Sequence, residues 1–254
     1  MTKIIMCGCF GRMGMVVCKL ATEHPNMEIA AGIDIVSGSA NFPVYKNINE
    51  CTTPADVIIN FMPPTAALEN ALAIVDYSVS KKIPLVLCTT GMPDELETAI
   101  QKAAEKVAVL RSANMSLGIN LLSNILSRIS QLLYDSGFDI EITERHHNQK
   151  LDAPSGTALL LADAVNAALS EEMTYTTDRS KTHALRKRNE IGIQALRGGT
   201  IVGEHSAIFA GLGEVIELKH TAHSREIFAV GSLKAAEFLR GKPSGMYTMQ
   251  DLMG

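Results

Sequence analysis

The sequence predicts an α/β protein in which an N-terminal, doubly wound parallel sheet is followed by a second, α+β domain with a mixed sheet. Through the first 116 residues, short apolar runs alternate with amphipathic helical segments, which is typical of parallel βαβ units. After residue 116 a long amphipathic stretch gives way to strand-like segments separated by glycine turns. Residues 226–254 begin with renewed helical periodicity. We therefore expect residues 1–116 and 226–254 to form one domain and residues 117–225 the other.

The individual elements follow from these patterns in order. In the first domain, strands are expected at residues 3–7, 28–33, 56–61, 84–88 and 107–110. Helices are expected there at residues 13–23, 65–79, 93–106 and 225–239. In the second domain we expect a helix at 117–133, a strand at 139–143 and a helix that opens near residue 157. Strands at 191–196, 201–209 and 215–222 are expected to follow one another, joined by turns at residues 198–199 and 211–213.

Composition excludes several classes of function. The 254 residues include 23 Lys and Arg against 27 Asp and Glu, a net charge of −4, so nucleic acid is not expected as a partner. No apolar run is long enough to span a bilayer, and the N-terminus lacks a signal pattern, so no membrane association is expected. The 5 cysteines are odd in number and lack the spacing of a zinc site. We therefore predict a cytoplasmic protein without a metal.

A glycine-rich turn follows the first predicted strand directly. Residues 8–14, GCFGRMG, match G-x-x-G-x-x-G and open a helix. In this setting Gly8 can make the turn, Gly11 can let the backbone approach a pyrophosphate, and Gly14 can let the helix pack on the sheet. The alternative is that these glycines serve only the turn and its packing.

An acidic residue stands where a dinucleotide-binding domain of the Rossmann type needs one. Asp34 ends the second predicted strand, 20 residues after Gly14, the separation expected for a carboxylate that binds an adenosine ribose. Ile35 follows Asp34 instead of an arginine that could neutralise a 2′-phosphate, although Arg12 could reach one. The residues therefore predict a nicotinamide dinucleotide, NADH or NADPH, and favour NADH.

Polar segments also follow the other predicted parallel strands. These are Asn60 with Phe61, residues 89–91, and residues 112–115. Because carboxyl ends of such strands line the cofactor crevice, we expect them at its rim, although each could be an ordinary loop. Cys88 could present a thiolate there, but a buried, small apolar role is favoured.

The segment between residues 144 and 157, ERHHNQKLDAPSGT, concentrates groups that carry protons and charge. One imidazole of His146 or His147 and the ammonium of Lys150 make a plausible pair of acid and anchor. The Ser-Gly-Thr sequence at 155–157 is typical of a helix N-terminus, which can bind a carboxylate. The alternative is that these residues only cap local backbone groups or face solvent.

These motifs together resemble the dihydrodipicolinate reductase family, the 4-hydroxy-tetrahydrodipicolinate reductases of bacterial and plant lysine biosynthesis. The resemblance rests on GCFGRMG at 8–14 and ERHHNQKLDAPSGTA at 144–158, and extends to TTG at 89–91, SANMSLGIN at 112–120, RGGTIVGEH at 197–205 and HSREIFAVGSLKAAEFL at 223–239. It implies reduction of 4-hydroxy-tetrahydrodipicolinate to tetrahydrodipicolinate by NADH or NADPH in the diaminopimelate route. It also implies a homotetramer in which the sheets of the second domains pack together.

The resemblance assigns roles by position. It implies proton transfer by His146 and Lys150, and binding of a small cyclic dicarboxylate by His147, Gly156 and Thr157. The implied cofactor-binding residues are Gly8, Cys9, Phe10, Gly11, Arg12, Met13, Asp34, Cys88, Thr89, Thr90, Ser112, Ala113, Asn114 and Met115. Cys9 and Phe10 depart from the small residues usual in the turn, and Met115 from an aromatic residue.

Other polar residues receive structural interpretations. The basic segment from Arg179 to Arg188 could steer a dianion, but a solvated loop with Asp178 and Glu190 as counter-charges is favoured. Three histidines, His205, His220 and His223, are assigned to structure. An aldehyde dehydrogenase that forms a thioester is disfavoured because no cysteine follows Cys88. A dinucleotide-sensing protein without catalysis stays open as an alternative.

Overall fold

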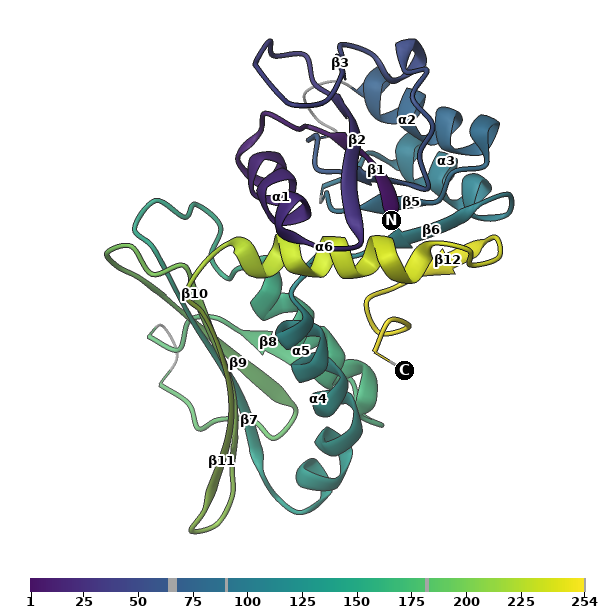
Figure 1. Cartoon of the computed structure of the whole chain (residues 1–254). Coiled ribbons are helices and arrows are strands. Elements are labelled where there is room, and N and C mark those ends of the chain that lie inside the picture. The colour runs from purple at the N-terminus through teal and green to yellow at the C-terminus, as the bar shows by residue number, and fades with distance from the viewer. Residues whose placement is uncertain (64–67, 90, 181–182, 254) are drawn as a thin grey trace. The chain divides into compact units, whose positions relative to one another are not determined.

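The computed structural model describes residues 1–63, 68–89, 91–180 and 183–253, and the chain divides into two compact units (Figure 1). The N-terminal unit consists of Met1–Leu117 and Glu226–Gly254, and the second unit of Gly118–Arg225. Among the helices of the described ranges, none is both long and apolar enough to cross a membrane.

The N-terminal unit is built on a parallel sheet. Its strands are β1 (Thr2–Cys7), β2 (Met27–Ile33), β3 (Val44–Tyr45), β4 (Val57–Asn60), β5 (Leu85–Leu87), β6 (Ala108–Arg111) and β12 (Gly245–Tyr247). Its helices are α1 (Arg12–Glu23), the 3-10 helix η1 (Ile48–Glu50), α2 (Leu68–Lys81), α3 (Asp94–Ala104) and α6 (Glu226–Leu239). The 7-stranded sheet has the order β12-β6-β5-β4-β1-β2-β3, and all neighbours are parallel. This confirms the doubly wound sheet that the alternation predicts.

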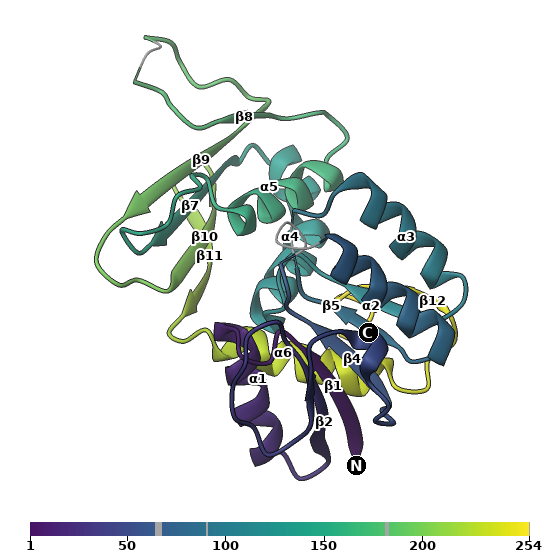
Figure 2. The ribbon, with the colours of Figure 1, turned by 90° about the horizontal axis from the view of Figure 1, so that it is seen from above.

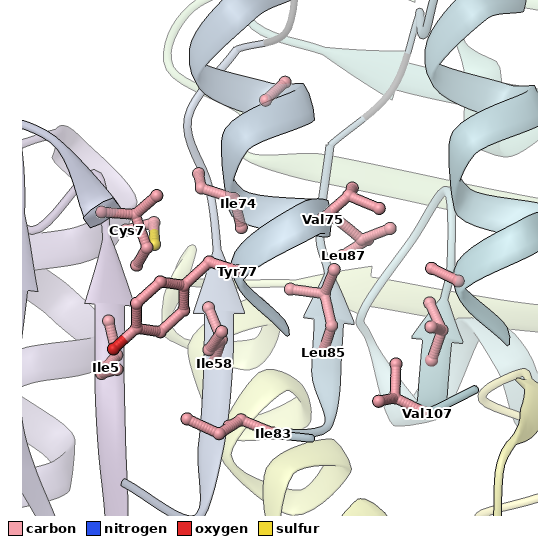
Figure 3. Close-up of a cluster of buried hydrophobic side chains, with 14 of the residues drawn as sticks. Ile5, Cys7, Ile58, Ile74, Val75, Tyr77, Ile83, Leu85, Leu87 and Val107 are labelled. Atoms are coloured by element: carbon pink, nitrogen blue, oxygen red, sulfur yellow. The ribbon is translucent and has the colours of Figure 1, made fainter. Parts of the chain in front are cut away.

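Helices cover both faces of this sheet. Successive side chains of a strand point to opposite faces, so each strand contributes to the core on both sides. Ile5 and Cys7 of β1 pack with side chains of α2 such as Ile74 and Tyr77 (Figure 3), and the same core includes side chains of α3. The hydroxyl of Tyr77 also donates to the carbonyl of Cys51 at 2.9 Å. Ile4 and Met6 pack on the opposite face with side chains of α1 and α6. Figure 2 shows the ribbons of these two helices beside the sheet. The near-continuous apolar runs in the sequence follow from this burial on both faces.

The second unit holds two helices against one mixed sheet. Its elements are α4 (Leu117–Asp135), β7 (Asp139–His146), α5 (Gly156–Ala168), β8 (Thr174–Thr176), β9 (Glu190–Arg197), β10 (Gly203–Ala210) and β11 (Val215–Ala222). The 5-stranded sheet has the order β11-β10-β7-β9-β8. Strand β10 is antiparallel to β7 and β11, whereas β9 is parallel to β7 and β8. The predicted mixed sheet is thus confirmed.

One predicted connection is wrong. Strands β9 and β10 do not form a hairpin, because β7 lies between them. The turn at residues 198–199 instead crosses the end of β7: the N–H of Gly198 donates to the carbonyl of His146 at 2.9 Å, and the N–H of Asn148 donates to the carbonyl of Gly199 at 3.2 Å. The turn is therefore bonded to the histidine-rich segment that follows β7. The predicted hairpin of β10 and β11 is confirmed.

The elements that the sequence patterns do not predict are short. They are β3 and β12 at the two edges of the parallel sheet, η1, and β8 at an edge of the mixed sheet. Strands of two or three residues are too short to show an alternation of apolar and polar positions. The helix expected at residues 65–79 runs from Leu68 to Lys81, and residues 64–67 lie outside the described ranges.

Helix α1 packs against the glycine turn with no room for a side chain at Gly14. A Cβ at this position would lie 1.9 Å from the carbonyl oxygen of Gly8. Gly8 itself has a φ of 83°, in the left-handed region that favours glycine. The turn and the first helical turn therefore depend on each other.

We predict that Gly14→Ala destabilises the chain, by about 1–3 kcal/mol as for overpacked sites. The sign of the change in stability distinguishes close packing from helix propensity, because propensity alone would make alanine stabilising by about 0.5–1 kcal/mol. Urea unfolding followed by circular dichroism measures the change, with Met15→Ala on the exposed neighbouring side chain as the control. Equal or greater stability of Gly14→Ala would contradict the close packing of α1 on the turn.

Candidate active site

The N-terminal unit has a cavity of about 480 Å³ at its glycine turn. The turn residues Gly8, Phe10 and Gly11 line it together with Arg12 and Met13. Further lining comes from residues 34–36, from the loop after β4 and from Asn70 and Ala71 of α2. A cavity at a helix N-terminus, lined by glycine backbone, suits a pyrophosphate.

Asp34 is a buried carboxylate that holds the turn and lines the same cavity. Its Oδ2 accepts the N–H of Phe10 at 2.8 Å, and its Oδ1 accepts the N–H of Val36 at 3.0 Å. A carboxylate offers about four acceptor positions, so capacity remains for a ribose hydroxyl. The geometry of the turn and of Asp34 is therefore compatible with a dinucleotide-binding site.

The predicted rim segments start at one edge of the parallel sheet. The register pairs Cys7 with Asn60, Asn60 with Leu87, and Leu87 with Arg111. The segments after these strands begin at Gly8, Phe61, Cys88 and Ser112. Thr90 lies outside the described ranges.

Some of the predicted cofactor-binding residues point their side chains into the core. Cys9 is 2% exposed and Met115 is 3% exposed, and both belong to the core on the α1 and α6 face. Burial raises the pKa of the Cys9 thiol to about 11 and raises that of Cys88 well above its ordinary value. The thiols of Cys9 and Cys88 are therefore not reactive nucleophiles.

The second unit buries a charged cluster where β7 and β9 end. Glu144 is completely buried, and its carboxylate accepts bonds from Nη1 and Nη2 of Arg197, each at 2.7 Å. Its Oε2 also lies 2.7 Å from Nδ1 of His146, and its Oε1 accepts the N–H of Ser155 at 2.9 Å. One carboxylate thus joins two strands and the start of α5.

The protonation of this cluster follows from its contacts. Burial raises the pKa of Glu144, but the hydrogen bonds from Arg197, His146 and Ser155 outweigh it and leave the pKa below its ordinary value. Burial lowers the pKa of His146, and Lys150 and Arg197 add to this, while Glu144 opposes it; the net shift is downward. At neutral pH we therefore expect a charged Glu144 beside an imidazole with an easily lost proton.

His205 belongs to this cluster, although the sequence assigns it to structure alone. Its Nε2 lies 3.1 Å from Oγ of Ser155, and its ring meets the ring of His146 edge-on at 5.0 Å. Burial lowers the pKa of His205 to about 3. Within the described ranges its buried Nδ1 has no hydrogen-bond partner.

The predicted anchor and anion site lie next to the cluster. Nζ of Lys150 is 2.9 Å from Oδ1 of Asp152, whose carboxylate is 57% exposed. Ser155 is the N-cap of α5, and its Oγ accepts the N–H of Ala158 at 3.2 Å. A Cβ built on Gly156 meets no atom within 4 Å, so the space beside this residue is open. Lys150 and, to a smaller extent, the backbone N–H of Gly156 lower the pKa of the Asp152 carboxylate. The structure therefore shows the helix cap at Ser155 together with open space beside Gly156.

The basic segment is bound to its own unit. Arg179 pairs with Glu141 and Glu190, and Arg186 pairs with Glu141 and Asp139. Arg188 lies over the ring of Tyr134, 4.0 Å from its centroid. These contacts favour the structural interpretation; Lys181 lies outside the described ranges. In the described part of the chain, no group of three or more His, Cys, Asp or Glu is placed to hold a metal ion.

Sequence reasoning missed Glu144, Arg197 and His205, yet the strand alternation contains a signal for them. Glu144 is in phase with Ile140 and Ile142, which are buried in the core of the second unit. A charged residue at a core position predicts a buried partner, because an unpaired buried charge is strongly unfavourable.

We predict that His205 makes the folded state sensitive to acid. Its pKa is about 3 in the folded chain and near 6.5 when unfolded, so between these values the unfolded chain binds more protons. This contribution is fully present above about pH 6.5 and is lost toward pH 3, by up to about 1.4 kcal/mol per pH unit. Urea unfolding across this range should show a weaker pH dependence for His205→Gln than for wild type. The control is His183→Gln, on an exposed side chain. Equal slopes for His205→Gln and wild type would contradict a neutral, buried His205.

Comparison with known sequences identifies close relatives over the full length. The family model described as "Dihydrodipicolinate reductase, N-terminus" matches residues 2–115, and that described as "Dihydrodipicolinate reductase, C-terminus" matches residues 118–253. A 4-hydroxy-tetrahydrodipicolinate reductase of Clostridium tetani is 47% identical over 254 residues, covering 100% of this chain and 97% of the relative. That of Caldanaerobacter subterraneus is 49% identical over 253 residues, covering 100% and 98%.

Solved structures show the same fold. The dipicolinate-bound dihydrodipicolinate reductase from Paenisporosarcina sp. TG-14 superposes with a TM-score of 0.81 at 22% identity, covering 98% of this chain and 97% of that one. The DAP dehydrogenase of C. glutamicum in complex with DAP has a TM-score of 0.58 at 12% identity, covering 100% of this chain and 95% of that one. Because both family models match and full-length relatives approach half identity, the chain belongs to the dihydrodipicolinate reductase family.

Proposed function

We propose that this chain reduces 4-hydroxy-tetrahydrodipicolinate to tetrahydrodipicolinate with a nicotinamide dinucleotide, in the diaminopimelate route of lysine biosynthesis. The full-length identity to reductases of this name supports the reaction. The observation that carries the assignment to residues is the cluster at the end of β7, where His146, Lys150 and the start of α5 lie on one short segment.

The dinucleotide fits the N-terminal unit. Gly8 to Met13 would hold its pyrophosphate at the start of α1, and Asp34 its adenosine ribose. When bound, it supplies the hydride for the reduction. The chain's own residues would hold the dinucleotide and supply the proton.

Lys150 and His146 are the proposed proton donors. An ammonium has three N–H donors, and Asp152 takes one of them, so Lys150 retains donors for a substrate carboxylate or ring atom. Nε2 of His146 faces Gly203, where a Cβ would lie at 3.0 Å, so the missing side chain keeps this nitrogen accessible. A positioned acid of this kind contributes about 10²–10⁴ in rate.

The start of α5 is the proposed carboxylate site. The first N–H groups of a helix lack partners within the helix, and its dipole favours an anion there. Gly156 and Thr157 occupy the first helical positions of α5, and His147 lies on the same segment as Lys150. The site therefore suits a small dicarboxylate that is held at one end by the helix and at the other by cations.

Cofactor preference, assembly and location complete the proposal. NADH is favoured because Asp34 would repel a 2′-phosphate. A homotetramer is supported by the mixed sheet, whose core with α4 and α5 lies on one face and leaves the other face for a second copy. A cytoplasmic location is supported by the 5 cysteines, all of them free thiols.

We predict that purified protein oxidises the nicotinamide only when 4-hydroxy-tetrahydrodipicolinate is added, as followed by the loss of nicotinamide absorbance. Lys150→Ala should lower kcat and raise KM, because each charge-assisted hydrogen bond to a carboxylate contributes about 1.5–3 kcal/mol. His146→Ala should mainly lower kcat, by about 10²–10⁴. Lys106→Ala removes the same charge from an exposed site and serves as the control for Lys150.

Two outcomes would contradict parts of this proposal. An unchanged kcat in folded His146→Ala would remove His146 from proton transfer. A protein that binds dinucleotide without turnover would favour a sensing function instead.

We further predict that wild type binds NADH more tightly than NADPH. Asp34→Asn removes the charge but keeps a side-chain oxygen for the N–H of Phe10, so NADPH affinity should rise relative to NADH. Arg12→Ala should have the opposite effect, because Arg12 lines the cavity and can pair with a 2′-phosphate. Fluorescence titration of each dinucleotide measures both ratios, and about 1.4 kcal/mol corresponds to a tenfold change. Ratios unchanged in both variants would exclude these residues from discrimination.

A further inference from the structure

We infer that Glu144, held by Arg197, is a positioning residue that fixes the Nδ1–H tautomer of His146 and, through Ser155, ties this imidazole to the start of helix α5. The inference rests on the proposed roles of His146 and α5 and deepens them. It concerns two residues that do not belong to the predicted donor or binding set.

The tautomer follows from the hydrogen bond. Glu144 is charged, since its partners hold its pKa below the ordinary value, and a carboxylate can only accept. Nδ1 of His146, 2.7 Å away, must therefore carry a hydrogen. In the neutral ring Nε2 is then the free lone pair, and in the charged ring it is the N–H that can be given away. A buried carboxylate sets the imidazole of serine proteases in the same way.

Arg197 keeps the carboxylate in place. Its two Nη atoms bind the two oxygens of Glu144 at 2.7 Å each, the bidentate arrangement that fixes both orientation and charge. The parallel register pairs Arg197 on β9 with His146 on β7, so both side chains reach the same face of the sheet. Nη2 of Arg197 also donates to the carbonyl of Asp152 at 2.6 Å.

The same carboxylate reaches the proposed anion site. Oε1 of Glu144 accepts the N–H of Ser155, the N-cap of α5, at 2.9 Å. A substrate held by Gly156 and Thr157 would therefore be placed relative to His146 through a chain of only two hydrogen bonds. Because both bonds end on one rigidly held group, the acid and the anion site cannot move independently.

The pH dependence of His146 reflects every charged or titratable group around it. Glu144 on β7 raises its pKa, whereas Lys150 in the following loop and Arg197 on β9 lower it. His205 on β10 meets its ring edge-on and is neutral at ordinary pH. Removal of the carboxylate should therefore lower the pKa of His146 further.

The test compares Glu144→Gln with the double variant Glu144→Gln/Arg197→Met. A lone glutamine leaves the arginine charge without its counter-ion and can impair folding, whereas a buried pair replaced as a whole is often tolerated. The matched control is Glu141→Gln. Glu141 is on the same strand, points to the other face of the sheet and is also paired with arginines.

The readouts are kinetics and the nitrogen signals of the histidines. Of the 7 histidines, His146 is assigned by the signal that disappears in His146→Ala. We expect wild type and Glu141→Gln to show the Nδ1–H tautomer of His146, and both Glu144 variants to lose this preference. Their kcat should fall by a part of the roughly 10²–10⁴ that a positioned acid contributes, with a smaller change in KM. The alkaline limb of their kcat profile should move to lower pH.

A spectrum that keeps the Nδ1–H tautomer in the folded Glu144 variants overturns the inference, whatever happens to kcat. A loss of the tautomer with unchanged kcat also overturns it, because Glu144 would then position nothing that turnover needs. Absence of reductase activity in wild type contradicts the proposed function instead, and the tautomer measurement distinguishes the two failures.

Discussion

A buried carboxylate determines how the polar end of the second unit is arranged. Removing an ion from water costs several kcal/mol, so the charge of Glu144 is compatible with burial only if every one of its partners is in place. Those partners come from β7, β9 and the N-terminus of α5. The register of β9 is constrained accordingly, because a shift of one residue would turn Arg197 to the opposite face of the sheet.

Long, periodic elements can be predicted from the sequence. The pairing of strands that are distant in the sequence cannot. The parallel sheet was predictable because its central strands are buried on both faces and are therefore almost wholly apolar, as in Leu85–Leu87. The edge strand Val44–Tyr45 has no such pattern. The insertion of β7 between β9 and β10 was also hidden. The glycines at 198–199 predict a turn, but only the bonds from Gly198 and Asn148 show that it crosses another strand.

The candidate site divides in the same way. His146, Lys150 and the start of α5 could be predicted because they lie within one short segment and carry proton and anion chemistry. Arg197 and His205 are distant in the sequence, and their strands carry few polar residues on the core face. Both are nonetheless in phase with buried residues, Arg197 with Ile193 and His205 with Ala207. Their place in the cluster becomes apparent only when the register brings them to Glu144.

The glycine turn of the N-terminal unit carries two large side chains, and glycines elsewhere make room for them. Cys9 and Phe10 stand where the resemblance leads one to expect small residues. Each lies against a glycine that makes room for it: a Cβ on Gly32 would meet Sγ of Cys9 at 2.6 Å, and one on Gly38 would meet the ring of Phe10 at 2.7 Å. The extra volume is thus absorbed by packing behind the turn, and the backbone can keep the shape that a pyrophosphate requires. The larger side chain of Cys9 therefore leaves the backbone atoms that line the cavity in place. Phe10, in contrast, also lines the cavity and can contact the dinucleotide directly.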